Sequence, residues 1–440
     1  MRSERDLAAV LRRAADDAPD PADLLAGLGE RRRRRTRQRY RTALAAAGVV
    51  AVAVGGTAVV RGGHVATAVG NRPSATSTAT AESTVTATAT TTATATATAT
   101  STGPVKPARE VWPEAVFTLP KKAADGSAYR PVTALSPTEI LVTAESSFEK
   151  AGRVEIYDLA NNTSRVLTEM VPQGKGYYEQ SVEAGSGHVA WYGTRPNTDD
   201  KWADFWVAPI QGGPAVRVGE VTGALSEVET IGVSADHVVW SPRSGGVYRI
   251  PIGGGEAEKM PDTDGMWLLA WPWAADVHVG VYAADTSDRN QRLLVNLETG
   301  ERRPVTAAAG VHRLRCAVEW CVGRSGEHLV AQRLDGSVTR ELSGGMSDQH
   351  IFGGRFVMVG REMYDISTGR AALVAAADED GKTSSYGQGI SSSPPSVFYW
   401  NSLPLKSRKV CRDGEQACAV TPTQPGDTFT VLNLAAVPAE

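Results

Sequence analysis

The sequence lacks the short motifs that mark common enzyme and nucleotide-binding classes. Neither HExxH, Gly-x-Ser-x-Gly nor a P-loop pattern occurs in its 440 residues. Histidine is also sparse, with seven residues and no cluster with the spacing of a metal site. We therefore expect no catalytic residue, no bound metal and no cofactor.

Cysteine is scarce as well and occurs only late in the chain. The four cysteines form two close pairs, Cys316/Cys321 and Cys411/Cys418, and no CxxC is present. An even, locally paired set in an exported protein predicts two short-range disulfides, with zinc ligation as the alternative.

The small net charge of −3 argues against a polyanionic partner, but the charge is unevenly placed. Residues 31–41 contain eight arginines, and the next nineteen, residues 42–60, carry no charge. An apolar run of this length flanked by arginines predicts a transmembrane helix with residues 1–41 in the cytoplasm. Nucleic-acid binding by the arginines and a long, cleaved signal peptide are the alternatives.

The segments around this span are simple in composition. Residues 3–19 have apolar positions at helical spacing and predict a short amphipathic cytoplasmic helix. Residues 61–109 are rich in Thr and Ala without apolar periodicity, which predicts a disordered stalk. The arrangement predicts a single-pass plasma-membrane protein whose residues 110–440 lie outside the cell.

Residues 110–440 contain one sequence pattern seven times: a turn followed by a short run of residues typical of a β-strand. The occurrences are residues 136–144, 185–193, 234–242, 274–282, 317–325, 353–361 and 394–402. Most are followed by two further runs joined by a Gly-, Asn- or Asp-rich turn, as in VYRIPIGGGEAEKM. Four short strands every 30 to 50 residues predict an all-β propeller of about seven blades, or six.

Two of these blades also resemble a known family. WSPRSGGVYRIPIGGG (240–255) and WVAPIQGGPAVRV (206–218) are similar to blades of TolB-like propellers, with a Ser-Pro turn and a Gly-Gly hairpin. Ser241-Pro242 lacks the Asp-Gly that follows in that family, and the Trp-Asp dipeptide of WD repeats is absent. The resemblance implies a propeller fold.

Aligning the repeats makes two detailed predictions. Cys316 falls on Val233 and Cys321 on Val238, facing each other across a hairpin, which suits a cross-strand disulfide. Residues 115–120 precede the first blade and residues 428–437 follow the last hairpin, so we expect these terminal strands to share one blade and close the ring.

Candidate binding residues lie where the repeat is broken. His188 and His237 occupy equivalent repeat positions and are interpreted as structural. An insertion at 192–206 and the segment MWLLAWPW (266–273) gather carboxylates and aromatic rings that could bind a glycan or peptide. These candidates are Asp199, Asp200, Trp202, Asp204, Trp206 and Trp271. Packing between blades is the alternative for the aromatic rings, and Ca²⁺ binding is a further one for the carboxylates.

Three functions follow from this arrangement. The first is a non-enzymatic, membrane-anchored propeller that binds a protein or cell-wall glycan outside the cell. The second adds signalling: the layout of residues 1–60 resembles membrane-anchored anti-sigma regulators, which implies that residues 3–30 dock a cytoplasmic regulator. The third is a propeller hydrolase or lyase that uses Asp199 or Asp204 as acid or base.

Overall fold

In the computed structural model, the described part of the chain lies within Ala89–Glu440. The described residues are 97–98, 105–147, 150–170, 173–174, 176–195, 201–278, 289–342, 350–374, 386–402, 406–410, 419–424 and 426–439. The predicted cytoplasmic segment, transmembrane helix and most of the stalk lie outside these residues. No helix among the described residues combines the length and hydropathy needed to cross a membrane.

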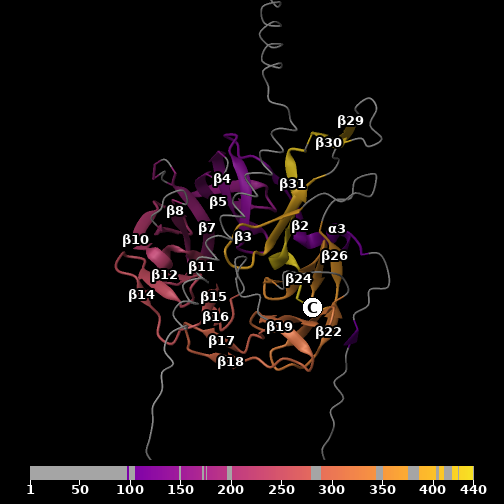
Figure 1. Ribbon diagram of the computed structural model, residues 1–440. Coiled ribbons are helices and arrows are strands. Elements are labelled where there is room, and N and C mark those ends of the chain that lie inside the picture. Colours follow the sequence, from indigo (N-terminus) through magenta and orange to yellow (C-terminus); the bar gives the residue numbers. More distant parts are fainter. Residues whose placement is uncertain are drawn as a thin grey trace, which may run out of the picture. The chain divides into compact units, whose positions relative to one another are not determined.

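Seven four-stranded antiparallel sheets follow one another along the chain as the blades of a β-propeller (Figure 1). Blade 1 contains β3 (Ala128–Ala134), β4 (Glu139–Ser147), β5 (Lys150–Asp158) and β6 (Thr163–Glu169). Blade 2 contains β7 (Tyr178–Gly185), β8 (His188–Thr194), β9 (Trp202–Pro209) and β10 (Val216–Thr222). Blade 3 contains β11 (Val228–Val233), β12 (His237–Pro242), β13 (Tyr248–Pro251) and β14 (Glu258–Lys259). Blade 4 contains β15 (Trp267–Ala270), β16 (Trp273–Ala275), β17 (Leu293–Asn296) and β18 (Arg302–Pro304).

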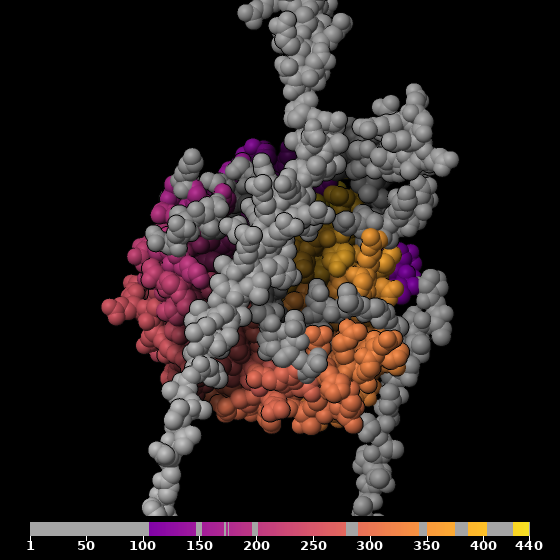
Figure 2. Space-filling model, in the orientation of Figure 1, coloured from indigo at the N-terminus to yellow at the C-terminus, as the bar shows by residue number. Residues whose placement is uncertain are grey.

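The remaining blades complete the ring, and Figure 2 shows the same succession of colours on the surface. Blade 5 contains β19 (Val311–Cys316), β20 (Trp320–Ser325), β21 (His328–Arg333) and β22 (Arg340–Leu342), with β1 (Ala97–Thr98) parallel to β22. Blade 6 contains β23 (Ile351–Phe352), β24 (Phe356–Val359), β25 (Glu362–Asp365) and β26 (Ala371–Leu373). Blade 7 contains β27 (Tyr386–Gln388), β28 (Val397–Asn401), β31 (Thr428–Asn433) and β2 (Val116–Pro120).

Blade 7 closes the ring by combining strands from both ends of the propeller. β2 pairs antiparallel with β31, from Val116 opposite Leu432 to Pro120 opposite Thr428. The sequence prediction of a shared terminal blade and of seven blades is thereby confirmed. β31 thereby lies between β28 and β2, and β2 forms the outer edge of this blade.

The described residues just before β2 pack against blades 6 and 7. Pro107 forms a parallel bridge with Leu373 of β26, and a single helical turn follows, α3 (Ala108–Val111), with η1 (Pro113–Ala115) after it. Trp112 between them is fully buried in the core of blades 6 and 7. Burial of this large ring anchors the N-terminal approach to the propeller.

Smaller elements lie in the connections. They are η2 (Gly223–Ser226), η3 (Leu434–Ala436) and the hairpin β29 (Lys406–Val410) and β30 (Ala419–Gln424). The hairpin joins β28 to β31, and its strands pair up to Val410 opposite Ala419. The disulfide predicted between Cys411 and Cys418 lies outside the described residues.

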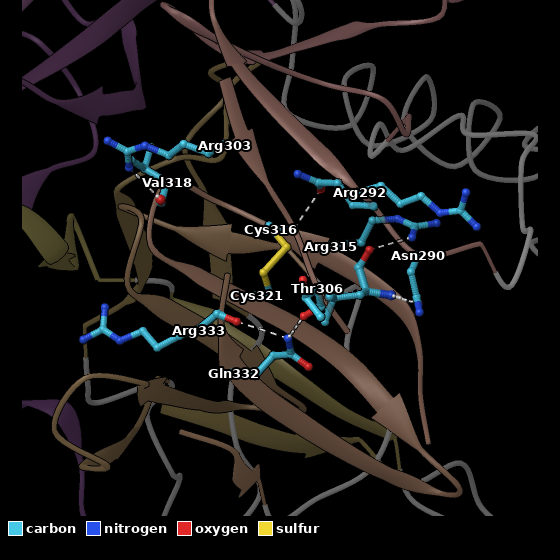
Figure 3. The surroundings of a disulfide bond; sticks show 12 residues. Asn290, Arg292, Arg303, Thr306, Arg315, Cys316, Val318, Cys321, Gln332 and Arg333 are labelled. Atoms are coloured by element: carbon cyan, nitrogen blue, oxygen red, sulfur yellow. Dashed lines mark hydrogen bonds between the residues drawn. A yellow bond between two sulfur atoms is a disulfide. The ribbon is translucent and has the colours of Figure 1, made fainter. Parts of the chain in front are cut away.

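The other predicted disulfide is present. Cys316 of β19 and Cys321 of β20 are directly opposite and joined by a disulfide (Figure 3). Val233 and Val238 pair in the same way in blade 3. The repeat alignment therefore placed both cysteines in the correct register, and the bond staples the hairpin between the first two strands of blade 5.

The core lies between successive blades rather than in one central mass. Phe205 of blade 2 packs on Trp240 of blade 3 with ring centroids 4.5 Å apart. Trp191 and Trp206 of blade 2 stack within the cluster that joins blade 2 to blade 1. Because strand side chains alternate between sheet faces, one strand contributes to the clusters on both sides of its blade.

Candidate functional site

The innermost strands position the site. The first strand of each blade lies nearest the axis, and β7, β11 and β15 contact one another there. In an antiparallel blade the connection from first to second strand lies at one end, and that from second to third at the other. We call the end with the first connections face I and the opposite end face II.

A segment of blade 7 crosses the axis on the side of face I. Residues 389–396, the crossing segment, join β27 to β28 but contact three other blades. Ile390 N–H donates to the Pro131 carbonyl of blade 1, and Ser392 Oγ accepts from Ile231 N–H of blade 3. Gly389 approaches blade 1 so closely that a Cβ there would lie 1.9 Å from the Val132 carbonyl oxygen. Only glycine fits at this position without displacing backbone.

A buried carboxylate of blade 2 anchors the crossing segment. Glu183 of β7 accepts hydrogen bonds at Oε1 from Ser391 Oγ, Ser392 Oγ and Ser393 N–H, at 2.5, 2.8 and 2.8 Å. Burial raises the pKa of this carboxyl, although the three hydrogen bonds act in the opposite direction. The short polar run Ser391–Ser393 thus satisfies a charge that would otherwise be costly to bury.

The crossing segment contributes to two cavities of different chemistry. The polar cavity, of about 550 Å³, contains residues from the first strands of blades 2, 3 and 4, with Ser391–Pro395 on its face I side. The apolar cavity, of about 310 Å³, is lined by the face I connections of blades 4, 5 and 6 together with Pro394. Trp271, Trp273 and Ile351 are among its lining residues.

One corner of the polar cavity holds charged groups in direct contact. Glu229 of β11 lies 3.3 Å from Arg243 Nε, just beyond β12, and 3.5 Å from His278 Nε2, beyond β16 of blade 4. The side chains of Glu229 and His278 are 6% and 8% exposed. A buried carboxylate, a guanidinium and an imidazole therefore meet where blades 3 and 4 adjoin.

Trp267 contacts two residues of this corner, His278 and Arg243. Its ring stacks on His278, with centroids 5.7 Å apart and planes 28° from parallel. Its indole N–H donates to the Arg243 carbonyl at 3.3 Å. One tryptophan thus restrains both the imidazole and the backbone of the arginine, which is how a binding group is held in a fixed orientation.

The structure does not gather the predicted binding residues at one place. Asp199 and Asp200 lie outside the described residues. Trp271 lies on face I, in the connection between β15 and β16, and lines the apolar cavity. Trp202, the first residue of β9, lies at the face II end of blade 2, at the opposite end from Trp271.

The other predicted residues lie in or beside the strands of blade 2. Asp204 is 1% exposed and accepts hydrogen bonds from Tyr177 Oη at 2.9 Å and Arg217 Nε at 3.1 Å. Burial, with Asp204 beside it, raises the pKa of the Tyr177 hydroxyl. Trp202 is half-buried and donates to Glu220 at 3.1 Å, and Trp206 packs in the core between blades 1 and 2. Their role in ligand binding stays a prediction.

Sequence reasoning missed the corner of Glu229, Arg243 and His278. The available signal for Glu229 was a carboxylate within the short run VETIGV, which forms β11. His278 lies in AADVHVGVY, whose alternation reads as a strand, whereas the observed strand β16 ends at Ala275. His188 and His237 lie near the starts of β8 and β12 and are not among the residues lining either cavity.

Comparisons with known proteins give only distant structural matches. No protein-family model matches the chain, and no curated protein matches it. Solved structures similar to it include YCF48 bound to D1 peptide, at 8% identity and a TM-score of 0.39, covering 72% of this chain and 97% of that one. Two oligogalacturonate lyases are also similar. One, in complex with manganese, has 12% identity, a TM-score of 0.35 and coverage of 56% and 75%. The other, from Vibrio parahaemolyticus, has 11% identity, a TM-score of 0.35 and coverage of 58% and 78%. At such low identities and TM-scores, no ligand or activity passes from these proteins to this chain.

Within the described residues, no group of three or more His, Cys, Asp or Glu side chains is arranged to hold a metal ion.

Proposed function

We propose that the chain is a membrane-anchored binding protein whose propeller takes up a small polar ligand in the polar cavity. The observation that carries this proposal is the form of the cavity: about 550 Å³, bordered by the crossing segment, with buried charged groups in one wall. Cavities of 300–1,000 Å³ with a few fixed polar groups are the usual form of small-ligand sites. The ligand is a glycan unit or a short peptide segment, because a folded domain cannot enter this volume.

The location outside the cell is part of the same proposal and rests on the sequence. The arginines of residues 31–41, the uncharged residues 42–60 and the Thr/Ala-rich stalk support an anchored ectodomain. The disulfide Cys316–Cys321 is compatible with an oxidising compartment. The resemblance of two blades to TolB-like propellers fits an exported binding module.

Screening the full-length chain against glycan and peptide arrays tests the binding function. We expect saturable binding of at least one class, and we expect Gln180→Trp, which fills the cavity wall, to abolish it. Gln211→Trp, on the exposed connection between β9 and β10, is the matched control and should bind normally. Equal binding by both variants would place the ligand elsewhere and refute the proposal.

The corner of the polar cavity favours one second candidate, a hydrolase or lyase. Glu229 and His278 are a carboxylate and an imidazole 3.5 Å apart in a cavity wall, a pair able to move a proton between them and a ligand. Incubating any ligand found on the arrays with the protein, and following its size by mass spectrometry, separates the two functions. Cleavage that is lost in Glu229→Gln would establish the enzyme.

A further inference from the structure

His278 carries a ring nitrogen that the fold itself does not satisfy. The imidazole is 8% exposed, and among the described residues its Nε2 has no hydrogen-bond partner. The nearest carboxylate oxygen in the corner is Glu229 Oε1, 3.5 Å away, which is too long for a good hydrogen bond. Buried polar atoms are nearly always paired, so an exception in a cavity wall indicates a group that the ligand supplies.

The chemistry of the two side chains defines that group. An ionised carboxylate only accepts hydrogen bonds, whereas a neutral imidazole nitrogen either donates or accepts. A ligand hydroxyl beside both atoms can donate its one proton to Glu229 and accept from His278 when Nε2 carries the ring hydrogen. A peptide carbonyl can only accept and a peptide N–H can only donate, so neither can serve both partners at once.

The charges of the corner favour a ligand without net charge. Arg243 lies 3.3 Å from Glu229 and balances its charge, so an ionic ligand would disturb a pair that is already compensated. Other lining residues of the polar cavity carry hydroxyl or amide groups, namely Gln180, Ser181, Thr230, Gln388 and Ser391–Ser393. Tyr192 and Phe352 add aromatic surface. Many hydroxyl-binding groups beside aromatic rings suit the polar edges and the C–H faces of a sugar.

We propose that the Glu229–His278 pair binds a hydroxyl group of a neutral saccharide, and that Trp267 fixes the orientation of the imidazole. The inference rests on the binding function proposed above and narrows its ligand from glycan or peptide to neutral glycan. It assigns to His278 a direct ligand contact and to Trp267 a positioning role.

Titration calorimetry of the full-length chain in detergent tests the inference. The saccharide probes are maltotriose, cellotriose and the β-1,4-linked trimer of N-acetylglucosamine, and the peptide probe is N-acetyl-trialanine amide. We expect at least one saccharide to bind saturably and the peptide not to bind. His278→Ala should weaken that saccharide at least tenfold. His278→Gln, whose amide nitrogen reaches the position of Nε2, should recover part of the loss.

Matched controls separate a lost contact from a damaged fold. His237→Gln alters an imidazole outside the cavity, and Glu155→Gln alters a glutamate of blade 1 that is 2% exposed; both should bind the saccharide as the unchanged protein does. Trp267→Phe should weaken binding less than His278→Ala while leaving the binding stoichiometry unchanged.

The outcomes distinguish failure of the inference from failure of the function. Saccharide binding that His278→Ala leaves unchanged would overturn the role of the pair. Binding of the peptide without any saccharide would overturn the ligand class while the binding function stands. Binding of neither class here or on the arrays would overturn both.

Discussion

Two buried glutamates on neighbouring innermost strands differ in what surrounds them. Glu183 of β7 is held at one oxygen by Ser391, Ser392 and Ser393 of the crossing segment. Glu229 of β11 faces the polar cavity, where its close partners are the side chains of Arg243 and His278. The first carboxylate is satisfied by hydrogen bonds from the chain itself, whereas the second lies beside side chains that also line the polar cavity.

This difference distinguishes a buried carboxylate that holds blades together from one that lines a cavity. A buried charge fully engaged by backbone and hydroxyl donors joins blades, and its removal should affect stability. A buried charge among titratable groups in a cavity wall is arranged for an exchangeable partner, and its removal should affect binding. Substitutions at the two positions should therefore separate these effects.

The largest expected effect is on stability, from Glu183→Ala. The substitution leaves the Ser391 hydroxyl and the Ser393 N–H without their acceptor, while the Ser392 hydroxyl keeps the Ile231 carbonyl as its other acceptor. We expect a loss of about 3 kcal/mol in the free energy of unfolding, since buried donors left unpaired cost about 1–3 kcal/mol each and some will reach water. Denaturant unfolding of the two proteins measures it. A change below about 1 kcal/mol would show that the crossing segment is not anchored by Glu183.

The disulfide provides a second change that should affect stability alone. Replacing Cys316 and Cys321 together by serine removes a bond that closes a very short loop, which should lower the free energy of unfolding by about 2 kcal/mol. The surrounding hydrogen bonds, such as that from Gln332 Nε2 to the Thr306 carbonyl, should persist (Figure 3). Ligand affinity should be unchanged, because Cys316 borders the apolar cavity and not the polar one. A tenfold loss of affinity in the double variant would contradict this separation of the two cavities.

Asp204 extends the comparison to a third buried carboxylate. Asp204→Asn keeps an acceptor for Tyr177 but turns an amide towards Arg217, so we expect a loss of about 1–2 kcal/mol in the free energy of unfolding. Thermal unfolding of the variant beside the unchanged protein checks this, and ligand binding should persist. Lost binding with unchanged stability would instead support the prediction from the sequence that Asp204 is a ligand-binding residue.

The smallest expected effect is the pH dependence of the free energy of unfolding that Glu183 causes. Burial raises the pKa of this carboxyl above its usual value of 4.5, so the folded protein holds its proton to higher pH than the unfolded chain does. Its contribution to stability is therefore present below pH 4.5 and is lost as the pH rises through the folded-state pKa. Relative to Glu183→Gln, which does not titrate, the unchanged protein should lose stability as the pH rises. Denaturant unfolding at a series of pH values measures the difference, and parallel curves for the two proteins would contradict it.

The repeated sequence pattern predicted the fold because the turn residues of each repeat specify a β-hairpin. The seven turn-and-strand runs and the alignment of Cys316 on Val233 required only the alternation of apolar residues and the Gly- and Asp-rich turns. The closure of the ring by β2 and β31 followed from two strands left over at the ends. These features depend on neighbours in sequence or on the need to cover a sheet edge.

The candidate site depends instead on contacts across the axis, which no local pattern contains. The run Ser391–Ser393 reads as a loop, and nothing near it in the sequence indicates that it meets Glu183, more than 200 residues earlier. Glu229 and His278 come from different blades and meet because those blades are neighbours in the ring. The described candidates of the insertion, Trp202, Asp204 and Trp206, lie instead in β9 of blade 2.

The most direct test makes the same substitution at both glutamates and measures binding of the saccharide identified by calorimetry. Glu229→Gln should lower the affinity at least tenfold, because an amide cannot replace the charged acceptor, and should leave thermal unfolding nearly unchanged. Glu183→Gln should retain the affinity, because its remaining carbonyl still accepts from the crossing segment. Equal affinities in the two variants, or a loss confined to Glu183→Gln, would contradict the assignment of the polar cavity as the binding site.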